Sequence, residues 1–143
     1  EMLAAVEEHA ADADALISAA AISDYTVEQS PEKIRSGQER LTLNLEPTPK
    51  LIDTVREAHP GLPMIGFKAE TEGTESDIVA RAWDLLYRAG LSFVVGNRAG
   101  VMGDDETAAV IVRGEDTERV SGTKTHLGGR VAYGLATTLS TPE

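Results

Sequence analysis

Residues 16–34 have the sequence LISAAAISDYTVEQSPEKI, which begins with a run of apolar and small side chains. Such a run is typical of a strand that is buried on both faces of a parallel sheet. The run stops at Ser23 and Asp24, and loops at the carboxyl ends of such strands line ligand crevices in α/β proteins. Lys33 follows on the same stretch and would place a cation beside the Asp24 carboxylate. These residues alone indicate a site for a small anionic ligand.

Length and cysteine content limit the class of protein. The chain has 143 residues, 41% of them hydrophobic, which is enough for a single core. We find no apolar run long enough to span a membrane, and the acidic start of the chain is unlike a secretory signal. The absence of cysteine excludes disulfides, thiolate zinc sites and a cysteine nucleophile. We therefore expect a cytoplasmic protein that does not enter a membrane.

The charge of the chain is strongly negative. It has 24 acidic and 13 basic residues, for a net charge of -11. An acidic surface repels the phosphate backbone, so we expect no nucleic-acid partner. The excess of carboxylates and the scarcity of lysines have two interpretations, ordinary solubility or adaptation to high salt, where screening relieves the self-repulsion.

The hydrophobic pattern predicts alternating helices and strands. We expect helices over residues 1–10, 50–58, 77–89 and 124–139, and strands over 16–22, 33–34, 41–45, 64–69, 91–95, 108–112 and 118–121. Thr48 would cap the second helix, and Thr74 or Ser76 the third. The strands at 33–34 and 41–45 would be joined by a mobile flap, with a plain solvent-exposed hairpin as the alternative. The expected fold is a three-layer, Rossmann-like α/β sandwich with a mostly parallel sheet and an appended antiparallel hairpin.

Three sequence blocks resemble a known family. The segments AAAISDY and PEKI, the block Gly-Phe-Lys-Ala-Glu-Thr at 66–71 and the block Val-Val-Gly-Asn at 94–97 follow one another in the family's order. They are similar to the phosphopantothenoylcysteine synthetase domain, the ligase part of a bifunctional coenzyme A biosynthesis protein, in an archaeal or halophile-like form. No segment resembles the glycine-rich N-terminal half of that family. Residues 1–143 are therefore expected to be a single partial domain, the C-terminal portion.

The resemblance implies a ligase that joins 4'-phosphopantothenate to cysteine through an acyl-nucleotide intermediate. It implies a nucleoside triphosphate as co-substrate, with CTP expected rather than ATP, and Mg²⁺ as the cofactor. It also implies a homodimer or larger homo-oligomer. The alternative is a nucleotide-binding or oligomerisation fragment without turnover of its own.

The resemblance also implies which residues contact the nucleotide. Asp24 would do so at the end of its strand, although a turn-capping role is the alternative for this residue. Small side chains before it would let backbone amides approach the ligand closely. Lys33 would act as a catalytic charge clamp over the triphosphate. The other residues expected at the nucleotide are Ser18, Ala19 and Ala20 on the first strand and Thr48, Pro49, Lys50 and Leu51 at the start of the second helix.

Two further positions complete the expected site. Phe67 would pack against the nucleobase, or else belong to the core, and Glu70 is a metal or ribose contact or a loop carboxylate. Relatives carry phosphate-binding lysines on the following helix, at positions that fall on Leu85 and Ala89 here. Lys68 is the expected substitute, ahead of two arginines of that helix, Arg81 and Arg88. No metal ligand is assigned.

Overall fold

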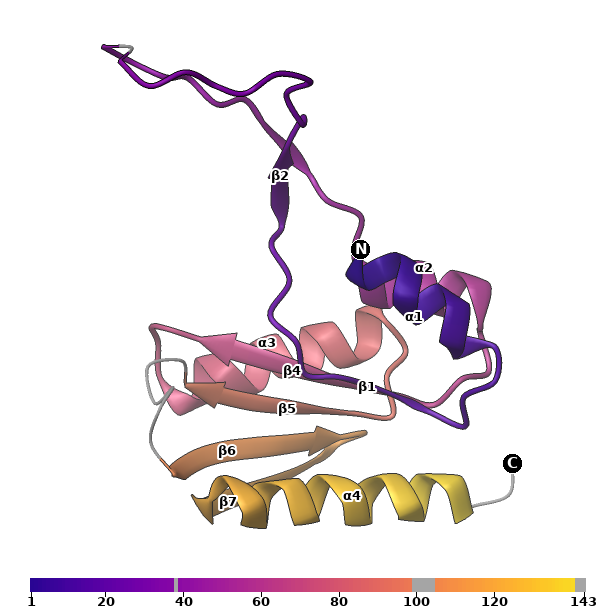
Figure 1. The fold of residues 1–143 in the computed structure, drawn as a ribbon. Coiled ribbons are helices and arrows are strands. Elements are labelled where there is room, and N and C mark those ends of the chain that lie inside the picture. The colour runs from indigo at the N-terminus through magenta and orange to yellow at the C-terminus, as the bar shows by residue number, and fades with distance from the viewer. Residues whose placement is uncertain (38, 99–104, 141–143) are drawn as a thin grey trace.

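The computed structural model describes residues 1–37, 39–98 and 105–140. Four helices and seven strands lie within these residues (Figure 1). The helices are α1 (Met2–Ala10), α2 (Leu51–Ala58), α3 (Glu75–Arg88) and α4 (Lys124–Ser140). The strands are β1 (Leu16–Ser18), β2 (Tyr25–Val27), β3 (Leu45–Pro47), β4 (Met64–Glu70), β5 (Phe93–Arg98), β6 (Glu106–Arg113) and β7 (Asp116–Thr123).

Five strands form one mixed sheet in the order β1-β4-β5-β6-β7. The strands β1, β4 and β5 are parallel, whereas β6 and β7 form an antiparallel hairpin that continues the sheet beyond β5. The expected α/β fold with an appended hairpin is therefore confirmed. Because β6 is antiparallel to β5, the start of β6 and the end of β7 lie at the carboxyl edge of the parallel strands.

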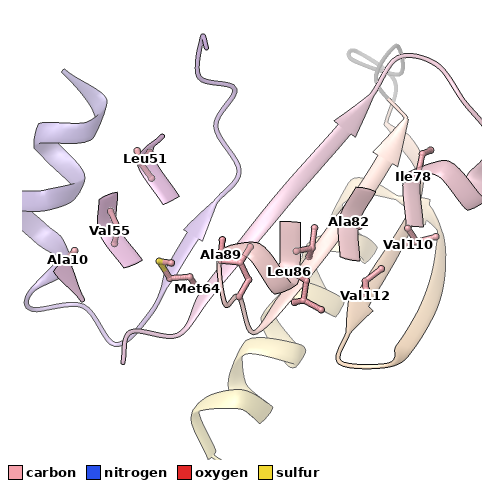
Figure 2. Packing of buried hydrophobic residues seen from close by; sticks show 12 residues of the cluster. Ala10, Leu51, Val55, Met64, Ile78, Ala82, Leu86, Ala89, Val110 and Val112 are labelled. Carbon is pink, nitrogen blue, oxygen red and sulfur yellow. The ribbon is translucent and has the colours of Figure 1, made fainter. Parts of the chain in front are cut away.

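Alternating side chains of the sheet build two cores, one on each face. On the first face, Met64, Val110 and Val112 pack with α1, α2 and α3, as Figure 2 shows. On the second face, Phe93 and Val95 pack with the apolar side of α4. The helices thus cover both faces, and the expected three layers are present (Figure 1).

The helix α3 begins and ends where local sequence signals predict. The Thr74 hydroxyl accepts a hydrogen bond from the Asp77 amide at 3.3 Å, and the Asp77 carboxylate accepts one from the Thr74 amide at 2.6 Å. This reciprocal pair is a capping box. The helix stops before Gly90, whose φ of 57° is easily reached only by glycine. The predicted cap at Thr74 is confirmed.

The expectation of a long, fully buried first strand is wrong. β1 covers only Leu16–Ser18, and the Ile17 side chain is 44% exposed. The physical reason is its position: β1 is the edge of the described sheet and pairs with β4 on one side only. Residues 19–24 leave the sheet without forming a strand.

An extended arm replaces the expected flap strands. The strands β2 and β3 pair at its root, with Tyr25 opposite Pro47 and Val27 opposite Leu45. Residues 28–37 and 39–44 run away from the body without regular secondary structure, so the strands expected at 33–34 and 41–44 are absent (Figure 1). We call residues 25–47 the arm. Nearly all of its residues are exposed, so no core face selects the strand register that the alternating pattern suggested.

Two smaller expectations have different outcomes. Thr48 does not cap α2: Lys50 occupies the cap position, and the Thr48 hydroxyl instead donates to the Ser23 carbonyl at 2.5 Å. The Ser23 carbonyl, in the segment between β1 and the arm, binds this hydroxyl, which therefore does not cap α2. The loop expected at 100–106 lies mostly outside the described residues.

Candidate functional site

A cleft of about 970 Å³ lies at the carboxyl ends of β1, β4 and β5. Its position follows from topology, because parallel strands end at one edge and the helices that connect them start there. The N-termini of α2, α3 and α4 all lie at this edge, since each helix precedes or follows a strand of known direction. Helix N-termini favour anionic ligands through their free amides. The cleft is therefore suited to a phosphate-bearing ligand.

Eight of the eleven residues expected at the site line this cleft. They are Ser18, Ala19, Ala20, Asp24, Lys50, Leu51, Phe67 and Lys68. Thr48 and Pro49 lie next to Lys50 but outside the lining, and Lys33 lies out on the arm. The structure thus brings together segments that are up to 50 residues apart in sequence, and it leaves the expected catalytic lysine away from them.

Asp24 is joined to the start of α2. Its carboxylate forms an ion pair with the Lys50 ammonium, and its carbonyl accepts a hydrogen bond from the Thr48 amide at 2.9 Å. The hydrogen bond and the charge of Lys50 lower the pKa of Asp24 below its ordinary value of 3.8. Asp24 is therefore ionised at neutral pH and holds the root of the arm at the edge of the cleft.

The Glu70 carboxylate pairs with two cations of the cleft, Lys68 and Arg81. It lies 3.0 Å from Lys68 Nζ, and the Glu70 side chain is only 11% exposed. Burial by itself would raise the pKa of Glu70, but the hydrogen bond and charge of Lys68, together with Arg81, outweigh it. The net pKa is below the ordinary value of 4.5. Glu70 is the last residue of β4 rather than a loop carboxylate, and it positions two cations, while a metal or ribose contact stays a prediction.

The cations of α3 follow helical spacing along the cleft. Arg81, Leu85 and Arg88 are one and two turns apart and all line the cavity. Arg88 Nη1 lies 2.6 Å from both Asp53 oxygens, which links α3 to α2. Arg81 is thus held by β4 and Arg88 by α2. Both arginines thus line the cleft together with Lys68.

Phe67 lies at the border between the cleft and the core, and its contact with a nucleobase stays a prediction. Its side chain lines the cleft and also packs against the core beneath α4. Along β4, alternation puts Lys68 and Glu70 on the α3 side of the sheet and Phe67 on the α4 side. The cleft therefore wraps around the carboxyl edge of the sheet rather than lying on one face.

Sequence reasoning missed several residues of the cleft. One signal in the sequence could have found Lys124. The helix that follows the predicted antiparallel hairpin must start at the edge where the parallel strands end, and Lys124 is the first residue of that helix. Asp84 follows Arg81 by three residues on α3, so helical spacing places both residues on the same face of that helix. The missed polar lining residues are Asp84, Asn97, Arg98, Thr107 and Lys124.

No cluster of three or more histidine, aspartate or glutamate side chains that could hold a metal occurs within the described residues. In the same part of the chain, none of the helices is both long and apolar enough to cross a bilayer.

The fold and the cleft define an α/β domain with a polar ligand site at the carboxyl edge of its sheet. Residues 1–138 match the family described as the DNA/pantothenate metabolism flavoprotein C-terminal domain, and the chain belongs to this family. It is 43% identical over 115 residues to the coenzyme A biosynthesis bifunctional protein CoaBC of Thermococcus kodakarensis, an alignment that covers 78% of this chain. It is 35% identical to CoaBC of Methanocaldococcus jannaschii, over 92% of this chain.

Solved structures agree with this assignment. The DNA/pantothenate metabolism flavoprotein of Streptococcus pneumoniae superposes with a TM-score of 0.83 at 25% identity, over 96% of this chain and 69% of that one. A mutant Cab2 in complex with phosphopantothenate-cysteine gives a TM-score of 0.59 at 25% identity, over 84% of this chain and 44% of that one. The alignments span only 28% and 33% of the two archaeal CoaBC chains.

Proposed function

We propose that this chain is the nucleotide-binding portion of a phosphopantothenate-cysteine ligase of coenzyme A biosynthesis. The observation that carries the proposal is the cleft itself, which unites eight residues expected at the nucleotide on one edge of the sheet. Membership of the family and the likeness to a protein solved with phosphopantothenate-cysteine support the same substrate class. The setting proposed for this reaction is the cytoplasm.

The proposed reaction has two steps. The carboxylate of 4'-phosphopantothenate attacks the α-phosphorus of a nucleoside triphosphate, a new carbon-oxygen-phosphorus link forms, and pyrophosphate leaves. The amine of cysteine then attacks the acyl carbon, an amide forms, and the nucleoside monophosphate leaves with the electron pair of the broken link. The chain needs no side-chain nucleophile for this sequence, because positioning and charge stabilisation supply the catalysis.

The cations of the cleft are suited to hold the triphosphate. Lys68 and Arg81 are oriented by Glu70 on the α3 side of the sheet, where they can contact phosphate oxygens. Ser18 and Ala19 let the backbone approach the ligand at the end of β1. We propose CTP rather than ATP as the nucleotide. Lys33 would add a further positive charge from the arm.

Within the described residues, the cleft fits Mg²⁺ through a single free carboxylate and not through a complete set of protein ligands. Proteins hold Mg²⁺ through one or two carboxylates together with substrate phosphates rather than through an all-protein cage. Asp84 is a carboxylate of the cleft without an ion-pair partner among the described residues, so it is available for this purpose. When bound, the ion neutralises phosphate charge.

The test of this function is turnover by the full-length protein. Pyrophosphate release should require both 4'-phosphopantothenate and a nucleoside triphosphate, and phosphopantothenoylcysteine should form when cysteine is added. Parallel assays with CTP and ATP would identify the nucleotide. Pyrophosphate release that does not depend on 4'-phosphopantothenate, or no release with either nucleotide, would contradict the proposal.

A second candidate is a nucleotide-binding fragment without turnover, and the partial coverage of the relatives favours it for residues 1–143 alone. Acyl transfer depends on holding two reactants in attack geometry, an advantage of about 7–11 kcal/mol. A chain that holds one reactant would retain binding but lose this term. Calorimetry with CTP, beside the pyrophosphate assay on this chain alone, separates the two candidates.

A homodimer or larger assembly is proposed as the functional form. The arm presents several apolar side chains to solvent, and exposed apolar patches of this kind mark protein contacts. They are Tyr25, Val27, Ile34, Leu41, Leu43 and Leu45. Light scattering on the full-length protein and on a Leu43→Asp variant would test whether the arm mediates the contact. A monomeric wild-type protein at assay concentration would contradict this assembly.

A further inference from the structure

A second cavity, of about 660 Å³, lies between β1 and α4 and adjoins the cleft. Its lining is mostly apolar and comes from α4, with Ile17 of β1 opposite. Four residues line both the second cavity and the cleft, and we call this set the seam. The seam consists of Phe67, Asn97, Thr107 and Lys124.

The topology explains why these four residues meet. Phe67 and Asn97 lie near the carboxyl ends of β4 and β5, and alternation directs them to the α4 side of the sheet. Thr107 is the second residue of β6 and lies at the same edge, opposite Gly122 near the end of β7. Lys124 follows β7 directly, and its amide donates to the Asp105 carbonyl at 2.9 Å. The seam is therefore fixed by the sheet and by the start of α4, not by a loop.

The polar side chains of the seam have no partners within the described structure. The other cations of the cleft are all engaged: Lys50, Lys68, Arg81 and Arg88 pair with carboxylates, and Arg98 donates to the Gly73 carbonyl. By contrast, among the described residues the Lys124 ammonium has no ion pair. The side chains of Asn97 and Thr107 likewise make no hydrogen bond there.

An ammonium, an amide and a hydroxyl supply several hydrogen-bond donors in one place. A negatively charged oxygen gains stronger, charge-assisted hydrogen bonds from such donors than a neutral group does. Lys124 need not give up an internal carboxylate before it binds a ligand, whereas Lys68 and Arg81 must share theirs. The seam is therefore the part of the cleft best prepared for an added anion.

We propose that the seam binds an oxyanion of the acid substrate, with Lys124 as the principal binding residue. This inference rests on the proposed ligase function. The residues expected at the nucleotide, Asp24, Lys50 and Lys68, line the cleft but not the second cavity. The seam opens instead into apolar surroundings that suit the uncharged body of an acid rather than a polyphosphate. The two reactants would then lie on opposite sides of the carboxyl edge of the sheet.

Steady-state kinetics of the full-length protein tests the inference. Lys124→Met keeps the aliphatic stem and removes the charge, so the KM for 4'-phosphopantothenate should rise roughly ten- to a hundredfold, as expected for losing a charged hydrogen bond. The KM for the nucleotide should stay unchanged. Lys124→Arg should restore most of the affinity. Arg130→Met is the matched control, because it removes a charge from the same helix outside both cavities.

The assay should be repeated with pantothenate, which lacks the phosphate. A penalty that disappears with pantothenate assigns Lys124 to the phosphate, and a penalty that persists assigns it to the carboxylate. An unchanged KM for the acid, or a raised KM for the nucleotide alone, would overturn the inference. If the wild-type protein makes no product, the ligase function fails. Calorimetric binding of 4'-phosphopantothenate to the wild type and to Lys124→Met then still tests the seam.

Discussion

The Lys50 ammonium forms an ion pair with the Asp24 carboxylate, which ties the start of α2 to the root of the arm across 26 residues of sequence. The Thr48 hydroxyl reinforces this tie through the Ser23 carbonyl. The arm therefore leaves the body from a point fixed on both of its strands. That point is also the edge of the cleft, so the position of the arm and the shape of the site are coupled.

Removing Lys50 should change the titration of Asp24. The hydrogen bond and charge of Lys50 lower the pKa of Asp24, so Lys50→Met should raise this pKa toward its ordinary value of 3.8. The carboxyl carbon of Asp24, followed by NMR during acid titration, reports the change. Lys33→Met is the control, because Lys33 lies out on the arm. The same pKa in wild type and Lys50→Met would contradict the ion pair.

The ion pairs of Glu70 should make stability depend on pH. Its pKa in the folded protein is below 4.5, so its contribution is fully present above that value. The contribution is lost as the pH falls through the folded pKa. At pH 7, Glu70→Gln should lower the free energy of unfolding by about 1 kcal/mol, since its partners are half exposed.

Urea unfolding of wild type and Glu70→Gln across this acid range checks the prediction. The difference between the two proteins should shrink as the pH falls. A difference that stays constant with pH would mean that the Glu70 charge contributes nothing.

Lys33→Ala should impair turnover of the full-length protein without changing its melting temperature. Losing one charge-stabilising donor costs roughly a hundred- to a thousandfold in rate. Lys33 is exposed and lies on the arm, away from both cores, so folding should not depend on it. Arg35→Ala, which removes a neighbouring charge from the same arm, is the control. Equal turnover by wild type and Lys33→Ala would end the assignment of Lys33 as catalytic.

Gly96 lets α3 approach β5 closely. A Cβ at this position would lie 2.8 Å from Ile78 Cγ2 and 3.0 Å from Val110 Cγ2, both in the core. Gly96→Ala should therefore destabilise the protein by about 1–3 kcal/mol through overpacking. Gly129→Ala is the matched control with the opposite sign. Its Cβ meets no atom within 4 Å, and alanine in a helix should stabilise by about 0.5–1 kcal/mol. Chemical denaturation measures both, and a Gly96→Ala protein as stable as wild type would show that α3 can shift freely.

Stability should rise with salt. The net charge of -11 produces self-repulsion, and the screening length falls from about 10 Å at 0.1 M to about 3 Å at 1 M. Thermal melting from low to molar KCl should show a rising midpoint. If the midpoint is flat or falls, the acidic composition serves ordinary solubility only.

Local sequence signals determined the elements whose causes are themselves local. The capping box at Thr74 and Asp77 and the glycine at 90 set the limits of α3, because each acts within a few residues. Short, mainly apolar runs at 64–69 and 108–112 identified β4 and β6, because a strand covered on both faces carries apolar side chains on both. The three family-like blocks likewise contain part of the cleft lining.

Tertiary structure alone decided which of these elements lie side by side. The exposure of Ile17 depends on β1 being the sheet edge, and the path of the arm depends on there being no core beneath it. The pairs Asp24–Lys50 and Glu70–Arg81, and the meeting of Asn97 with Lys124 in the seam, join residues that are far apart in the chain. Such contacts arise from sheet order and strand direction, which no local pattern encodes. The sequence could therefore name the residues proposed for the nucleotide, but only the packed sheet placed Lys124 beside most of them and Lys33 away from them.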